Sequence, residues 1–147
     1  ALRSRNHFVL KSSQAKKEWS FRKHKFVIGH ILKKFAQKHH IGLISFANVG
    51  NHLHLYLEVS NRVQYRKYIR AISSAIMMEV TGFSRWNPSP KGFKFWDARP
   101  YSRIVSTWTE MKTMVRYIVK NQWQGLGATN QEARELAHLG WALARDG

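Results

Sequence analysis

Cysteine is absent from this chain of 147 residues. Its absence excludes disulfide bonds, zinc sites built on cysteine and thiol nucleophiles, and it suits a reducing compartment. No apolar run reaches the roughly 18 residues that a membrane-spanning helix requires. The first residues also lack the apolar region of a signal peptide. We therefore expect a cytoplasmic protein with no membrane partner.

Acidic residues are scarce as well. Asp and Glu together number 8 against 25 Lys and Arg, which gives a formal net charge of +17. A field of this sign attracts polyanions, so nucleic acid is the leading partner, with anionic membrane surfaces and ribosomal RNA as rivals. A nuclease with two metal ions needs several convergent carboxylates, which so few and so scattered acids do not supply. If this chain cleaves a phosphodiester, we expect it to use histidine and one metal ion.

Hydrophobic residues make up 44% of the chain and aromatic residues 13%, enough for the core of one domain over residues 1–147. Apolar periodicity and turn signals predict the order β-α-β-β-α-β-α-α, over residues 7–12, 20–39, 41–49, 52–59, 61–80, 93–97, 107–121 and from about 129. This order predicts an α+β fold, a ferredoxin-like (RRM-like) antiparallel sheet. Two helices should cover one face and leave the other available, and a helical extension should follow from about residue 129.

The second arm of the predicted hairpin alternates histidine with leucine. Side chains alternate between the two faces of a strand, so His52 and His54 should project together while Leu53 and Leu55 enter the core. Two neighbouring imidazoles can chelate a divalent cation. A His-x-His pair on an exposed strand can also simply face solvent. In either case the imidazoles should point away from the core, and their removal should change folding little.

The helix predicted over residues 107–121 carries a second pair of polar groups. Tyr117 and Asn121 are four residues apart, so they lie on one helix face beside the apolar stripe. A tyrosine can act as a nucleophile, and an amide oxygen can complete a metal site. The alternative is that Tyr117 is a boundary aromatic residue and Asn121 only ends the helix.

Three segments in the same order resemble a known family. NVGNHLHLYLEV resembles the HUH motif (His, bulky hydrophobic residue, His) of single-tyrosine transposases, and MVRYIVKNQ resembles their tyrosine helix. FKFWDARPYSRIV resembles the block that precedes this helix in the REP-associated tyrosine transposases. The chain has Gln122 where the family usually has proline after the amide. It has Val49-Gly50 where Met-Pro often precedes Asn-His.

The resemblance implies a bacterial enzyme that cuts and rejoins single-stranded DNA beside hairpins. Tyr117 would be the catalytic nucleophile and would form a 5′-phosphotyrosine intermediate. A divalent metal ion, Mg²⁺ or Mn²⁺, would be held by His52, His54 and Asn121. Such an enzyme would act as a monomer or homodimer, associated with the nucleoid when bound to DNA.

Candidate DNA-binding residues lie in three parts of the chain. Phosphate contacts are predicted near the N-terminus and on the tyrosine helix, and base contacts just before that helix: Arg22, Lys23 and Lys25; Arg116 and Lys120; Trp96, Arg99 and Tyr101. A basic run can also be only a solvated surface, and Trp96 could equally belong to the core. Two alternatives to the transposase hypothesis therefore stay open: a basic module that binds RNA or DNA without cutting, and a domesticated transposase that acts in regulation or repeat maintenance.

Overall fold

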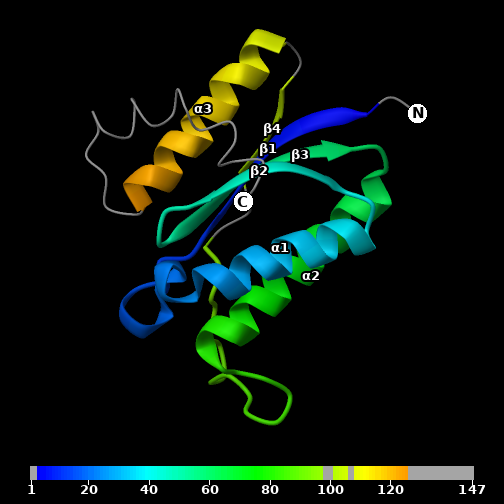
Figure 1. Ribbon diagram of the computed structural model, residues 1–147. Coiled ribbons are helices and arrows are strands. Elements are labelled where there is room, and N and C mark those ends of the chain that lie inside the picture. Colours follow the sequence, from blue (N-terminus) through cyan, green and yellow to red (C-terminus); the bar gives the residue numbers. More distant parts are fainter. Residues whose placement is uncertain (1–2, 98–100, 106–107, 126–147) are drawn as a thin grey trace.

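Four antiparallel strands form the centre of the molecule (Figure 1). The computed structural model describes residues 3–97, 101–105 and 108–125. The sheet has the order β2-β3-β1-β4, built from Gly42–Asn48, His52–Val59, Ser4–Lys11 and Tyr101–Val105. This is the ferredoxin-like arrangement, so the predicted fold class is confirmed. The predicted extension from about residue 129 lies outside the described residues.

Helices cover both faces of this sheet. Helices α1 (Lys25–Lys38) and α2 (Arg62–Thr81) pack side by side on one face, and α3 (Trp108–Gly125) lies over β2 and β3 on the other (Figure 1). The face that the sequence left available is therefore covered, in part, by the helix that contains Tyr117. None of the helices within the described ranges is long and apolar enough to cross a lipid bilayer.

The alternation of β3 divides its side chains as predicted. Leu53, Leu55 and Leu57 are fully buried in the core against α1 and α2. The core also takes side chains from both helices, among them Ile28, Leu32, Tyr68, Ile72 and Ile76. Because a one-residue slip would turn every leucine of β3 to the other face, this burial sets the register of the strand and hence the side on which its histidines project.

The boundaries of α2 follow from its caps. The side chain of Asn61 accepts hydrogen bonds from the backbone N–H groups of Val63 and Gln64, at 2.8 and 3.1 Å. Gly82 ends the helix in the left-handed conformation, with φ 76°. Both predicted signals are confirmed, since each satisfies backbone groups that a helix end leaves without partners.

Two predicted elements differ from the structure. The helix expected from Ser20 begins at Lys25, after two 3₁₀ turns over 17–19 and 21–24. The strand expected over residues 93–97 is wrong, because β4 is Tyr101–Val105. Residues 93–97 form a loop that closes on the end of β1, where the Asp97 N–H donates to the Lys11 carbonyl at 2.9 Å. The buried ring of Phe95 holds this loop in the core.

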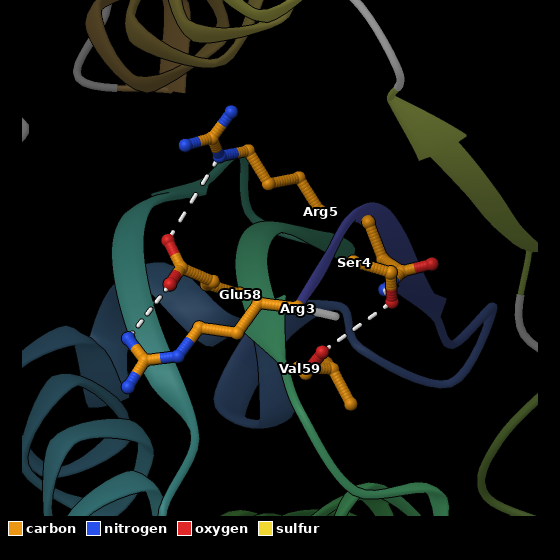
Figure 2. A network of polar contacts seen from close by, with 6 residues as sticks. Arg3, Ser4, Arg5, Glu58 and Val59 are labelled. Carbon is orange, nitrogen blue, oxygen red and sulfur yellow. Dashed lines mark hydrogen bonds and ion pairs between the residues drawn. The ribbon is translucent and has the colours of Figure 1, made fainter. Parts of the chain in front are cut away.

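One of the few acidic side chains is bound at the far end of β3 (Figure 2). Glu58 forms ion pairs with Arg3 at 2.9 Å and with Arg5 at 3.8 Å, while the Ser4 hydroxyl donates to the Val59 carbonyl at 3.5 Å. Exposed pairs of this kind contribute only about 0–1 kcal/mol to stability. Glu58 lies four residues from His54, about 13 Å along an extended strand. It is therefore too far away to act as a ligand or base beside the histidines.

Candidate active site

His52 and His54 lie together at the start of β3, on the face opposite the leucines. Their ring centroids are 4.8 Å apart and their planes are inclined by 69°. The tight turn before them is stabilised by the Asn48 side chain, which accepts from the Gly50 N–H at 3.0 Å. Gly50 has φ 100°, a conformation that residues with a Cβ rarely adopt. The predicted pairing of the two imidazoles is thus a product of strand alternation and of this turn.

Helix α3 brings Tyr117 to the same place. The Tyr117 ring lies edge-on to the His54 ring, with centroids 5.3 Å apart and an interplanar angle of 87°. Val115, Ile118 and Val119 are buried and anchor the helix on the sheet. Tyr117 itself keeps 46% of its surface exposed. A solvent-accessible phenol therefore stands beside the imidazole of His54, which comes from a distant part of the sequence.

His54 is far less accessible than the alternation alone suggested. Its exposed fraction is only 4%, because α3 covers it, whereas His52 is half-buried. Both rings point away from the α1–α2 core as predicted. The ring of His54 packs against His7 and Tyr117, so we now expect its removal to affect folding more than that of His52.

The hydrogen bonds at Nδ1 of His52 and His54 bear on whether Nε2 of each ring offers a lone pair. His52 Nδ1 lies 2.7 Å from Asn51 Oδ1, which can only accept, so Nδ1 carries the proton and Nε2 presents a lone pair. His54 Nδ1 lies 3.1 Å from His7 Nε2. His54 Nε2 is buried and has no hydrogen-bond partner among the described residues. A buried ring nitrogen without a partner, next to a second free lone pair, fits a divalent cation that accepts imidazole ligands.

Burial also sets the charge of these imidazoles. The pKa of His54 is lowered to about 3, chiefly by burial and further by the neighbouring His52 and His7. The pKa of His52 is lowered by burial and then by the positive charge of Lys11, its cross-strand neighbour. Both rings are therefore neutral at pH 7. Neutral imidazole is the form that binds a metal ion, so no proton has to be displaced first.

The lowered pKa of His54 predicts acid sensitivity of the metal-free protein. Because the folded pKa is below the unfolded value near 6.5, stability is full above that pH. It falls as the pH drops from about 6.5 towards 3. The expected loss is up to about 5 kcal/mol. Denaturant unfolding in EDTA at several pH values measures it. A His54→Gln variant should show a shallower decline, and equal slopes would contradict the assignment.

Within the described part of the chain, no three His, Cys, Asp or Glu side chains are grouped to hold a metal ion. A third protein ligand of these types is therefore not found there. Asn121 follows Tyr117 by four residues in α3, about one helical turn. Its side chain lies outside the described part, so its role as third ligand stays a prediction.

No family model matches the chain, and no curated protein matches it. Solved structures do match it, among them two transposases. One is a REP-associated tyrosine transposase bound to a REP hairpin, with a TM-score of 0.58 and 10% identity over 82% of this chain and 67% of the other. The second is a candidate transposase from Deinococcus radiodurans R1, with a TM-score of 0.54 and 12% identity over 83% and 92%.

The fold is shared with transposases. At this level of identity the likeness concerns the path of the backbone and not the chemistry of the side chains. It agrees with the α+β class described above. The functional assignment consequently depends on the residues that this fold brings together.

The predicted phosphate-binding residues lie in different parts of the structure. Arg22 lies over the turn before His52, where a Cβ on Gly50 would be 3.1 Å from its Nε atom. Lys23 forms an exposed ion pair with Glu18 at 2.7 Å, and Lys25 lies over the ring of Phe26. The two cations of α3, Arg116 and Lys120, are exposed and half-buried respectively. The structure therefore brings Arg22 to the histidine turn, while Arg116 and Lys120 share a helix with Tyr117.

The predicted base-binding residues precede α3. The Trp96 indole N–H donates to the Ser73 carbonyl of α2 at 3.0 Å, and the ring packs against Phe21 and Phe95. Trp96 thus lies on the α1–α2 side of the sheet, which favours the core interpretation. Arg99 lies outside the described residues. Tyr101 begins β4 and pairs with Val9, which itself pairs with His54, and its side chain is outside the described part.

His7, which was not predicted as a site residue, lies on β1 and contacts both His54 of β3 and Tyr117 of α3. Its ring stacks on His54 with centroids 5.3 Å apart and meets Tyr117 edge-on at 6.1 Å. The alternation of the first strand puts His7 on the face opposite Phe8 and Leu10, a signal that was present in the sequence. The strand order was needed to show that this face meets His54.

Proposed function

We propose that this protein is a metal-dependent single-stranded DNA endonuclease and strand transferase of the transposase type, with Tyr117 as nucleophile. The proposal depends chiefly on one observation. The phenol of Tyr117 and the imidazoles of His52 and His54 converge from α3 and β3, at 5.3 and 4.8 Å between neighbouring ring centroids. A nucleophile beside a pair of metal-type ligands is the arrangement that covalent phosphodiester cleavage requires.

His52 and His54 would hold the metal ion through their Nε2 atoms, and Asn121 would complete the protein ligands. We propose Mg²⁺ or Mn²⁺ as the ion, and the imidazole ligands argue that Mn²⁺ is at least competent. When bound, the ion would act as a Lewis acid towards the scissile phosphate and offset its developing negative charge. The protein contributes neutral rings whose positions are set by Asn51, by His7 and by the strand itself.

Tyr117 would carry out the bond exchange. Its phenolic oxygen attacks the phosphorus, an O–P ester forms, and the bond between the phosphorus and the 3′ oxygen breaks. The phenol proton leaves to solvent, which reaches this partly exposed side chain. The departing 3′ oxygen takes up a proton and becomes a 3′-OH. The 5′-phosphotyrosine conserves the bond energy, so attack by another 3′-OH rejoins DNA without ATP.

The charge of the protein supports a DNA hairpin as substrate. The net charge of +17 favours a polyanion, and one protein of similar fold was solved bound to a REP hairpin. Arg22 lies beside the histidine turn, and Arg116 and Lys120 share a helix with Tyr117, so these three cations would contact phosphates near the attacked bond. Phosphate contacts would position the strand but carry little sequence information.

The enzyme should cut a single strand beside a hairpin and leave the same sequence uncut in a full duplex. Tyr117 stands on one rigid helix and has one line of approach to a phosphate, which a paired strand would obstruct. Cleavage of labelled oligonucleotides with Mn²⁺ measures the difference, expected to exceed about 100-fold. Binding should weaken steeply with salt, because phosphate contacts release counterions. Equal rates on both forms would indicate a general nuclease.

A non-catalytic nucleic-acid-binding module is the second candidate, favoured by the strong positive charge alone. The same experiment separates the two functions. Tight, salt-dependent binding with no covalent protein–DNA adduct under Mg²⁺ or Mn²⁺ would support the binding module. An adduct that survives denaturation would support the enzyme.

A further inference from the structure

His7 touches the candidate metal ligand His54 directly. The two residues lie on adjacent antiparallel strands, where His54 pairs with Val9, so His7 is its diagonal neighbour. Aromatic side chains can reach one another across this diagonal. Here the rings stack at an interplanar angle of 16°, and His7 Nε2 lies 3.1 Å from His54 Nδ1. His7 is itself buried, with an exposed fraction of 6%.

A hydrogen bond between two neutral imidazoles contains one proton, and its location decides what His54 offers at its other nitrogen. If His7 donated, His54 would carry its proton on Nε2 as a buried donor, for which the described residues provide no acceptor. If His54 donates from Nδ1, its Nε2 becomes a bare lone pair. Buried N–H groups without partners are rarer in proteins than buried acceptors without partners, so donation by His54 is favoured.

We propose that His7 is a positioning residue that accepts the Nδ1–H of His54 and thereby holds the Nε2 lone pair of His54 ready for a metal ion. This inference rests on the proposed function, because it assigns His54 as a metal ligand. His7 does not touch the metal ion in this account and acts only through His54. Metal-binding histidines commonly donate their second ring nitrogen to a neighbouring group, which sets the tautomer and the ring orientation.

The two proposed ligands, His52 and His54, would then be oriented in the same way. Asn51 accepts the Nδ1–H of His52 at 2.7 Å, as His7 would accept that of His54 at 3.1 Å. Each imidazole would then carry its proton on Nδ1, where one neighbour accepts it, and would offer the lone pair of Nε2 to the metal ion. The stack of His7 on His54 also limits rotation of the ligand ring, which lowers the cost of ordering it when a cation binds.

Two variants separate acceptance of the hydrogen bond from simple packing. His7→Phe keeps a ring that can stack but removes the acceptor. His7→Gln keeps an acceptor oxygen near the position of Nε2. His30→Gln, at an exposed position of α1, is the matched control. We expect His7→Phe to weaken Mn²⁺ binding by about 10- to 100-fold and His7→Gln by less than about 3-fold. Calorimetry on the DNA-free protein measures these affinities, with thermal unfolding as the check on folding.

A second measurement uses no metal and no DNA. In ¹⁵N NMR spectra of the metal-free wild type, the two ring nitrogens of His54 should show a protonated Nδ1 and a bare Nε2. In His7→Phe the proton should move towards Nε2. A wild-type His54 protonated on Nε2 would overturn the proposal, even if His7→Phe did not fold. So would a folded His7→Phe with wild-type Mn²⁺ affinity, or a folded His7→Gln as weak as His7→Phe.

These results also distinguish the inference from the proposed function. A wild-type protein that forms a DNA adduct, combined with unchanged Mn²⁺ affinity in His7→Phe, contradicts the role of His7 alone. A wild-type protein that binds no Mn²⁺ contradicts the metal site and, with it, the function assigned to His7. In that case the NMR spectrum still decides whether the hydrogen bond runs from His54 to His7.

Discussion

Tyr117→Phe should form no covalent adduct with DNA and should lose strand cleavage by at least about 10⁴-fold. The substitution removes only the phenolic oxygen, which is the attacking atom in the proposed reaction. The ring that packs edge-on against His54 is retained. DNA affinity should therefore stay within about 3-fold of wild type, because the cations proposed to bind phosphates are untouched. Cleavage of a labelled hairpin oligonucleotide and a binding titration at one salt concentration measure the two effects.

A matched control for this variant is Tyr65→Phe. Tyr65 lies on α2 and packs against Phe8 on the other side of the sheet, so its hydroxyl is remote from the histidines. Tyr65→Phe should cleave DNA like the wild type. Cleavage that survives in Tyr117→Phe would place the nucleophile elsewhere, or would point to attack by water.

His52→Ala and His54→Ala should each abolish metal-dependent cleavage, with losses of at least about 10³-fold at any Mn²⁺ concentration tested. Each substitution removes one of the two imidazoles that are proposed to bind the metal ion. The Mn²⁺ titration of adduct formation measures the loss. His39→Ala is the control, because this half-buried ring stacks on Phe35 in the opposite layer. An unaltered titration in either site variant would contradict the metal site.

The two histidine variants should differ in stability. His54 is 4% exposed and packed between His7 and Tyr117, so His54→Ala should lower the free energy of unfolding by about 2 kcal/mol. Replacement of the half-buried His52 by alanine should lower the free energy of unfolding by less than about 1 kcal/mol. Denaturant unfolding of the two variants in EDTA measures the difference without any contribution from metal binding.

Much of the fold is predictable from local patterns in the sequence. The alternation of β3 predicts both the buried leucines and the paired histidines, since side chains on a strand alternate between faces. The cap at Asn61 and the stop at Gly82 predict the ends of α2, because each satisfies backbone groups locally. The pairing of Tyr117 with the histidines was predicted from the family resemblance, because helix spacing alone left open that Tyr117 was only a boundary aromatic residue.

Features that depend on contacts distant in sequence were not predictable in this way. The segment 93–97 has the composition of a strand, but Phe95 and Trp96 are drawn into the core and the strand forms at Tyr101–Val105. The burial of His54 follows from the position of α3, which helix periodicity alone does not give. The contact of His7 with His54 depends on the order of the strands, in which β1 lies beside β3.

The central claim, that Tyr117 attacks DNA, is tested most directly by locating the covalent bond. Trypsin cuts after Arg116 and Lys120, so Tyr117 falls in a short peptide separate from the other tyrosines, Tyr56, Tyr65, Tyr68 and Tyr101. After reaction of the wild-type protein with a hairpin oligonucleotide and Mn²⁺, nuclease and trypsin digestion should leave a nucleotide on a peptide that contains Tyr117, as read by mass spectrometry. A nucleotide on any other residue, or cleaved DNA with no modified peptide, would contradict the account.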